Sequence, residues 1–223
     1  MTEGSHGDPP TPAGEGLPLV MVPSAAGAGA CANDRCLIWH PEDEVLVPMA
    51  PAPGKRDALS VSLIDAELCS SISRENTVAM ALTAVSACLD AILAVELGCM
   101  GTSPETRENL LELGVRGIGE VGMGLPRALA GKDVAARELL SSASLCAGQL
   151  SAITPAPATQ ILARAAGSLL CRHSYPSVCS TVFPHVVGDM IEQANSFSSD
   201  AEMSEAMNRG MQYSNTPYTW CTR

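Results

Sequence analysis

The side chains of this chain that could do chemistry are few and scattered. Its 223 residues include four histidines and nine cysteines. The cysteines form no C-x-x-C pair, their number is odd and several lie within apolar runs, so we expect buried free thiols in a reducing compartment rather than disulfides or a zinc site. There is no G-x-S-x-G motif, and the histidines lie near termini, turns or prolines. Ser-His-Asp hydrolysis therefore has no support in the sequence.

One cysteine and one histidine are close in sequence, at Cys171 and His173. A nucleophile and its base are usually brought together by the fold rather than by sequence, so this proximity does not indicate a catalytic cysteine. A single imidazole without partners is also more typical of a surface or hydrogen-bonded histidine than of a metal ligand. We assign no catalytic residue to this chain.

Two glycine-rich segments could approach a phosphate group. Gly117–Gly122 matches G-x-G-x-x-G, which binds a dinucleotide only between a strand and a helix. Here it follows the helical stretch ENLLELGVR, so we expect it inside a helix, where glycine allows close packing at some cost in helix stability. Pro23–Ala30, PSAAGAGA, is a better candidate than Gly117–Gly122 for the remnant of a cofactor-binding loop. The alternative is that this segment is only a turn made of small residues.

The elements that must position these residues are mainly helical. Apolar residues make up 46% of the chain and aromatic residues only 3%, which favours close-packed helices over a β-sandwich. Ser103 and Asp133 are predicted helix N-caps, and Gly131 is a predicted stop signal. The expected helices cover about residues 74–97, 103–130, 133–150, 158–171 and 177–194. The predicted fold is a mainly α helical bundle with a small β remnant near the N-terminus.

Short strands are expected before the helices. Leu17–Val22 is predicted to be a buried strand, residues 36–39 and 44–47 a hairpin around the turn HPED, and residues 60–64 a further strand. The division that follows is an extended or disordered arm at 1–16, a strand and hairpin region at 17–64, a helical domain at 65–194 and an extended tail at 195–223. Within that tail, residues 201–211 could form one amphipathic turn.

The charge of the chain argues against some partners. A net charge of −11 repels phosphate backbones and anionic membranes, so we expect neither nucleic-acid binding nor direct membrane insertion. No apolar run reaches about 18 residues free of charge, and we therefore expect no transmembrane helix. The acidic N-terminus resembles neither a secretory signal nor a typical mitochondrial presequence. We expect an intracellular, reducing location, in the cytoplasm or in an organelle such as the mitochondrion.

Several short motifs, in order, resemble those of the iron-containing alcohol dehydrogenases. Leu17–Cys31 is similar to that family's strand and turn "P-T-T-A-G-T-G-S-E", with matches at Pro23, Ala26, Gly27 and Gly29; Ser24 and Ala28 stand where Thr is usual, and Cys31 replaces Glu. Further similar segments are Leu63–Leu68 to "I-L-D-P-E-L", Leu125–Ala128 to "L-P-R-A", Ala143–Gly148 to "A-S-L-L-A-G" and Phe183–Val186 to "L-P-H-V". Each motif is weak alone, but their order and spacing over residues 17–190 are specific when taken together.

The resemblance implies the helical, metal-binding domain of that family, in a truncated and degenerate form. Of the nucleotide-binding half we expect only the last strand and turn, and most of the carboxy-terminal helices have no counterpart. The family's metal site, with one Asp and three His, is implied as well. In the motif "D-A-L-T-H-A" the Asp and the first His lie four residues apart on one helix face. Aligned from Asp65, these two positions hold Thr83 and Ala87, and a shift of a few residues restores no pair.

The two remaining ligand positions also hold other residue types. The motif "H-A-L-A-H-P-L-G" falls on residues 160–167, which places Gln160 and Arg164 where histidines are expected. The last ligand follows a proline in "P-H-G" and corresponds to Ser177, or to Tyr175 when counted back from Pro184. None of these side chains replaces carboxylate and imidazole for a divalent cation at useful affinity, and Arg164 opposes a cation directly. We expect no metal at these positions.

Three functions remain open on the sequence alone. We favour a non-catalytic accessory or structural subunit of a larger protein assembly, which would contact other subunits through an exposed apolar face and through its ends at 1–16 and 195–223. The alternatives are a metal- and NAD(P)-dependent alcohol dehydrogenase-like oxidoreductase completed by another chain, and a binding module in which Arg164 attracts a small anion. We expect no cofactor, so the loop residues are then vestigial: Pro23, Ser24, Ala26, Gly27 and Gly29.

Overall fold

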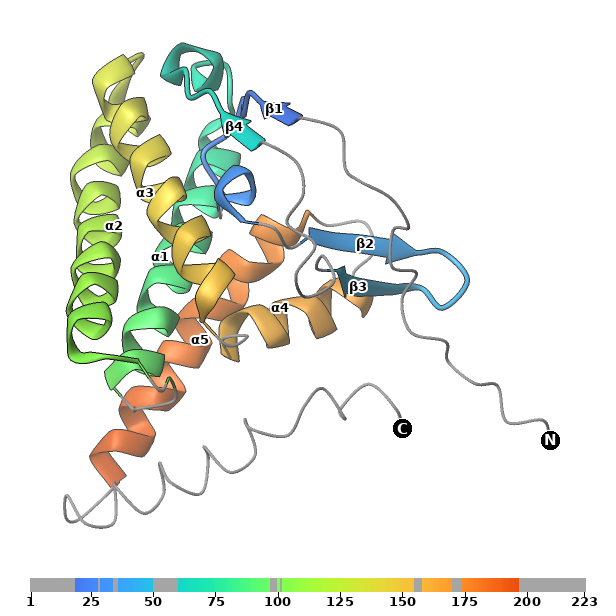
Figure 1. Cartoon of the computed structure of the whole chain (residues 1–223). Coiled ribbons are helices and arrows are strands. Elements are labelled where there is room, and N and C mark those ends of the chain that lie inside the picture. Colours follow the sequence, from blue (N-terminus) through green and yellow to red (C-terminus); the bar gives the residue numbers. More distant parts are fainter. Residues whose placement is uncertain are drawn as a thin grey trace.

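The computed structural model describes residues 19–27, 29–33, 36–49, 60–96, 100, 102–154, 158–169 and 174–196. Within these residues, two short strand pairs accompany a bundle of helices (Figure 1). The strands are β1 (Leu19–Met21), β2 (Cys36–His40), β3 (Val45–Met49) and β4 (Ser60–Ser62), and the helices are α1 (Arg74–Glu96), α2 (Pro104–Ala130), α3 (Val134–Ile153), α4 (Ala158–Leu169) and α5 (Tyr175–Ser196). The predicted mainly α fold is confirmed.

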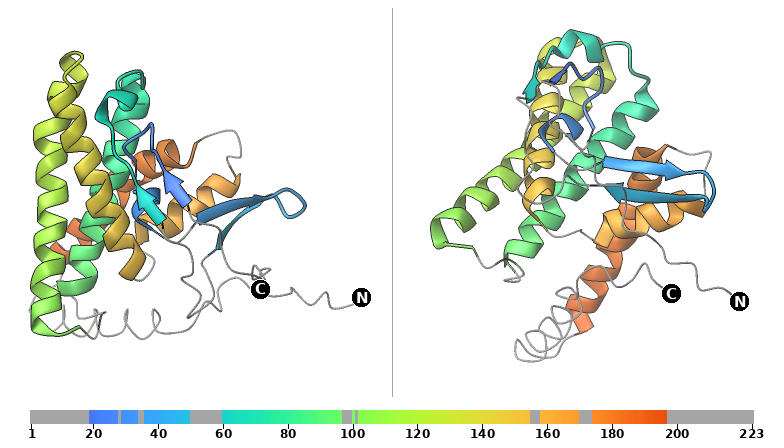
Figure 2. Two further views of the ribbon diagram at one scale, coloured as in Figure 1. Left: turned by 45° about the horizontal axis from the view of Figure 1, so that its top comes forward. Right: turned by 45° about the vertical axis from the view of Figure 1, so that its right-hand side comes forward.

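Helices α1, α2 and α3 lie side by side and form the main core (Figures 1 and 2). The core side chains are small or aliphatic, with alanine the commonest. Because these side chains are short, the helix backbones approach closely: a Cβ on Gly117 of α2 would lie 2.6 Å from the Cys88 Sγ of α1. The low aromatic content of the sequence is thus matched by a closely packed helical core.

The ends of α2 and α3 lie where the sequence predicts them. The Ser103 side chain accepts a hydrogen bond from the Thr106 backbone N–H at 3.2 Å, and α2 ends before Gly131. The Asp133 carboxylate likewise accepts from the Ala136 N–H at 3.0 Å where α3 begins. Both caps satisfy backbone donors that have no partner within the helix.

Helices α4 and α5 form a second group beside α1. Ala163 of α4 packs with Val178 and Cys179 of α5, and α5 packs along α1. The hairpin β2–β3 lies against α4, where the Leu46 N–H donates to the Ser168 Oγ at 3.2 Å (Figure 1). This hairpin is antiparallel and has the strand pairing predicted from the sequence.

The strand pair β1–β4 is parallel, and one expectation about it was wrong. Val20 pairs with Val61, and the alternation along the strands places Val22 and Leu63 on the same face. The strand was expected to be buried, but Val20 is 64% exposed and Leu63 is 58% exposed. The apolar composition suits a covered sheet, whereas no described element covers this face. We call these four side chains the β1–β4 outer face.

Helix α1 is the one described helix that is long and apolar enough to cross a membrane. No such helix was expected from the sequence, because no apolar run reaches about 18 residues free of charge. Of the most apolar window of α1, 56% is buried in the structure, and the central helix of a bundle passes the same test of length and hydropathy. The packing of α1 therefore accounts for its composition.

Some features discussed from the sequence lie outside the described residues. They are the arm at 1–16, the tail beyond residue 196 with its segment 201–211, Ala28 of the small-residue turn, and the neighbours Cys171 and His173. The predictions made for them stay predictions.

Candidate functional site

Gly29 ends the small-residue turn and packs against α3. It has a left-handed backbone (φ 69°), which disfavours any residue with a side chain. A Cβ at Gly29 would meet the Ser144 carbonyl and lie 2.5 Å from the Gly148 nitrogen. The close approach of two backbones thus accounts for glycine at this position.

The preceding residues of the turn also have packing roles. Ala26 packs against the main core, and a Cβ at Gly27 would be in ordinary contact with the Met80 side chain of α1. Pro23 is half-buried, whereas Ser24 is exposed. These contacts give the turn a structural role beside the helices.

The positions that the sequence resemblance aligns with metal ligands are Thr83, Ala87, Gln160 and Ser177, and they lie on the helices α1, α4 and α5. Thr83 is fully buried, and its hydroxyl donates to the Ala79 carbonyl at 2.8 Å, with a longer contact of 3.5 Å to the Pro176 carbonyl of α5. This contact brings Thr83 next to the residue that precedes Ser177. Ala87 is also buried, one turn further along α1.

The hydrogen bonds of Gln160 and Ser177 are local. The Gln160 carbonyl accepts a hydrogen bond from the Arg164 Nε at 3.3 Å. The Ser177 carbonyl accepts from the Ser180 and Thr181 hydroxyls, each at 2.9 Å, while the Ser177 hydroxyl pairs with that of Ser174. Among the described residues, no three His, Cys, Asp or Glu side chains are grouped so that they could hold a metal ion.

A buried polar cluster occupies the same helix junction, and sequence reasoning missed it. Ser86 of α1 lies with its Oγ 3.4 Å from the Cys179 Sγ of α5, and Asp90 of α1 interacts with Thr159 of α4. We call these four residues, together with Thr83, the junction cluster. Asp90 could have been found, because it is the one charged residue in the interior of α1, whose other charged residues lie at its two ends.

The Asp90 carboxyl and the Thr159 hydroxyl are the incompletely satisfied groups of the junction cluster. Asp90 is 8% exposed, and neither its Oδ2 nor the Thr159 hydroxyl oxygen has a hydrogen-bond partner among the described residues. Burial raises the pKa of Asp90 to about 7, and polar interactions with Thr159 oppose this rise only in part. The carboxyl is therefore a mixture of its neutral and charged forms near neutral pH.

The remaining charged neighbour of this junction is Arg164. Burial raises the pKa of the Tyr175 phenol, while the positive charge of Arg164 lowers it and the negative charge of Asp90 raises it. Opposite charges thus act on the same phenol.

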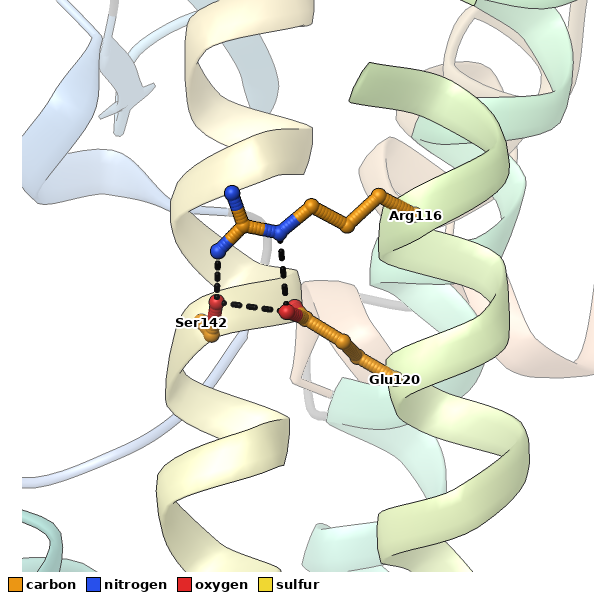
Figure 3. A network of polar contacts seen from close by, with 3 residues as sticks. All are labelled: Arg116, Glu120 and Ser142. Carbon is orange, nitrogen blue, oxygen red and sulfur yellow. Dashed lines mark hydrogen bonds and ion pairs between the residues drawn. The ribbon is translucent and has the colours of Figure 1, made fainter. Parts of the chain in front are cut away.

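The G-x-G-x-x-G segment lies inside α2, as expected, and carries a polar contact to α3. The Arg116 Nε donates to the Glu120 Oε1 at 2.9 Å, and a second Arg116 nitrogen donates to the Ser142 Oγ at 3.0 Å (Figure 3). Ser142 in turn donates to the Glu120 Oε1 at 2.9 Å. This triangle ties α2 to α3, and the segment belongs to a continuous helix rather than to a phosphate-binding loop.

The described cysteines are free, as the sequence predicts, and four of the six are buried. Burial raises the pKa of Cys88 to about 12, and the nearby Cys146 and Glu120 add to the effect. Burial also raises the pKa of Cys69, Cys146 and Cys179. A thiol that stays protonated is a poor nucleophile. Cys36 is the exposed member of the set.

An open hollow of about 580 Å³ lies on the surface of the described residues, away from these positions. All its lining residues belong to the N-terminal half of α2: Pro104, Arg107, Glu108, Leu111, Glu112 and Val115. None of the positions that correspond to metal ligands contributes to it. The hollow therefore gives no support to a site built on α1, α4 and α5.

Comparison with known proteins gives the fold a context. No family model matches the sequence, and no curated protein matches it either. Solved structures do match: the iron-containing alcohol dehydrogenases from Thermotoga maritima (19% identity, TM-score 0.62) and from Corynebacterium glutamicum (21% identity, TM-score 0.61), and the maleylacetate reductase from Agrobacterium tumefaciens (18% identity, TM-score 0.62). The matches cover 86%, 88% and 79% of this chain but only 47%, 53% and 46% of those chains.

This likeness defines the class of fold. The architecture is that of the mainly α domain found in iron-containing alcohol dehydrogenases. The resemblance seen in the sequence motifs is thus confirmed at the level of the fold. The chain spans about half the length of these structures, and identity is low. The fold carries no statement about activity.

Proposed function

We propose that this chain is a non-catalytic subunit of a larger protein assembly that uses the helical domain of an alcohol dehydrogenase-like fold as a scaffold. The observation that carries the proposal is the helix junction of α1, α4 and α5. Thr83 and Ala87 are buried there, and the Thr83 hydroxyl is bonded to backbone carbonyls. Side chains of these types bind a divalent cation too weakly to support metal-dependent hydride transfer.

The β1–β4 outer face supports the subunit role. Both faces of parallel sheets are normally covered, because the connecting helices pack on them. Here Val20, Val22, Val61 and Leu63 are all exposed on one face, and Leu68 follows them in an exposed position. A group of exposed aliphatic side chains of this kind is typical of a protein contact surface. The partner in this proposal is another protein subunit that covers the β1–β4 outer face.

The first test is the metal content of the full-length chain, produced with iron and zinc in the medium and measured by mass spectrometry. The proposal expects far less than one metal ion per chain. A stoichiometric metal that Thr83→Val removes would overturn it, and an increase in Tm on adding NADH would favour an oxidoreductase completed by another chain. Valine has nearly the shape of threonine, so this substitution keeps the packing and removes the hydroxyl.

The second test concerns the assembly. The tagged chain in native extract should migrate well above its own mass of 23.1 kDa. Val20→Lys, in the β1–β4 outer face, should release it from that assembly without changing its Tm. Ile191→Lys on α5, a side chain of similar exposure at 57%, is the matched control and should leave the assembly intact. Migration as a lone chain before any substitution would contradict the subunit role.

A further inference from the structure

The exposed face of α2 carries apolar side chains that do not pack against the described core. Helix α2 lies at the outer edge of the bundle in every view (Figures 1 and 2). Val115 is 63% exposed and Met123 is 58% exposed. They share this face with Gly119, Gly122 and further exposed positions at a spacing of three and four residues.

This face of α2 has two halves of different character. The half near the start of the helix carries carboxylates. The half near its end carries apolar or small residues, flanked by the exposed Arg116 and Arg127, whose charges pair with Glu120 and Asp133. The carboxylates are Glu105, Glu108 and Glu112, and the apolar or small residues are Val115, Gly119, Gly122, Met123, Pro126 and Ala130. All of these positions are exposed.

The glycines of α2 divide into two groups by what surrounds them. A Cβ at Gly114 would lie 2.7 Å from the Ile92 side chain, and a Cβ at Gly124 would lie 2.9 Å from the Ala136 carbonyl. Packing against α1 and α3 therefore accounts for such glycines. Gly119 and Gly122 have nothing within 4 Å. They weaken the helix relative to alanine without any compensating contact inside the described part of the chain.

We propose that this face binds the same face of a second copy, with the two α2 helices antiparallel and crossing near Gly122 and Met123. The face is complementary to itself, because Met123 of each copy would fill the space above the glycines of the other. In this register Val115 lies opposite Ala130. A shallow crossing of about 20° keeps the apolar halves in contact along their length.

Charge selects the antiparallel direction. A parallel pairing would put Glu105, Glu108 and Glu112 opposite their own copies, and like charges in contact oppose association. The antiparallel pairing separates the two acidic halves. It also brings Glu112 of one copy near Lys132 of the other, just beyond the end of α2. Both residues are exposed. The two ends of the contact are thus electrostatically favourable.

The size of the contact sets the expected strength. One helix from each copy buries less than the roughly 800 Å² per partner of a standard interface. We therefore expect a weak dimer that forms with increasing concentration. This proposal does not depend on the β1–β4 outer face, which lies on other elements and is tested by other variants.

The test is sedimentation of the full-length chain over concentrations from about 1 µM to about 1 mM. The proposal expects a reversible monomer–dimer equilibrium. Met123→Lys should raise the dissociation constant by about tenfold or more, because it places a charge in the centre of the contact. Ile191→Lys on α5 is the matched control and should leave the equilibrium unchanged. A monomer at every concentration, or a dimer that Met123→Lys leaves intact, would overturn the proposal.

A charge exchange tests the register. Glu112→Lys and Lys132→Glu should each weaken the dimer about threefold to tenfold, and the double variant should restore most of the loss. Within one chain these residues are about 30 Å apart along the helix axis, so restoration can only come from a contact between copies. Loss without restoration would contradict the antiparallel register. Gly119→Ala gives a further check: it should weaken the dimer, and higher stability with unchanged association would show a face without a partner.

Discussion

Gly29 lies directly against Gly148, so that the backbone of the small-residue turn touches the backbone of α3. A Cβ on Gly148 would lie 2.8 Å from the Gly29 carbonyl carbon and 2.9 Å from its Cα. The two glycines belong to two different motifs that resemble the iron-containing alcohol dehydrogenases and lie far apart in the sequence. This contact explains the glycine in each motif without a cofactor, because it holds the strand region against the helical bundle.

Gly29→Ala should therefore destabilise the fold. The new Cβ would meet α3, and the left-handed backbone of Gly29 adds strain, which together cost about 2–4 kcal/mol. Urea unfolding measures this loss. Gly188→Ala on α5 is the control, because a Cβ there meets nothing within 4 Å. It should leave stability unchanged or raise it by up to about 1 kcal/mol. Equal effects of the two substitutions would argue against the contact.

Ser142→Ala should loosen the attachment of α2 to α3. The hydroxyl both accepts from Arg116 and donates to Glu120, so its removal should cost about 1 kcal/mol. Thermal or urea unfolding of Ser142→Ala, Arg116→Ala and the double variant measures the coupling. Effects that simply add would mean that the triangle in Figure 3 contributes no mutual stabilisation.

Stability should fall as pH rises through the range set by Asp90. Its folded pKa of about 7 lies above the ordinary value of 3.8, so between these values the folded chain keeps a proton that the unfolded chain has lost. Each step up in pH in this range therefore favours unfolding, by about 2–3 kcal/mol in all from pH 5 to pH 8. Asp90→Asn removes the ionisation and should raise Tm more at pH 8 than at pH 5.

The control for this pH dependence is Glu138→Gln, at an exposed carboxylate on α3. It should not change the slope of stability against pH over the same range. If Asp90→Asn leaves that slope unaltered as well, the carboxyl does not have the raised pKa that its burial implies.

Thiol labelling should distinguish the exposed cysteine from the buried ones. Cys36 is exposed, whereas Cys88, Cys146 and Cys179 are buried with raised pKa values. A short pulse of iodoacetamide on the native chain, mapped by mass spectrometry, should label Cys36 and leave the three buried thiols intact until urea is added. Rapid labelling of Cys88 in the native chain would mean that the core around α1 opens readily.

The helix boundaries followed from the sequence because their signals are local. The side chains of Ser103 and Asp133 each accept a hydrogen bond from the backbone N–H three residues further along the chain. Such a local hydrogen bond can form in any fold that contains the helix. The mainly α fold class followed in the same way from apolar spacing and low aromatic content. Burial of Val20 was predicted wrongly, because exposure depends on which element covers a strand, and local composition does not carry that information.

The residue types at the positions that the resemblance aligns with metal ligands, Thr83, Ala87, Gln160 and Ser177, can be read from the sequence without any structure. Their surroundings come from the packing of the helices. This packing places the lone carboxyl of Asp90 beside Thr159. The raised pKa of Asp90 depends on burial by helices that are far apart in the sequence. The residue type sets only the ordinary pKa, and the tertiary structure sets the shift from it.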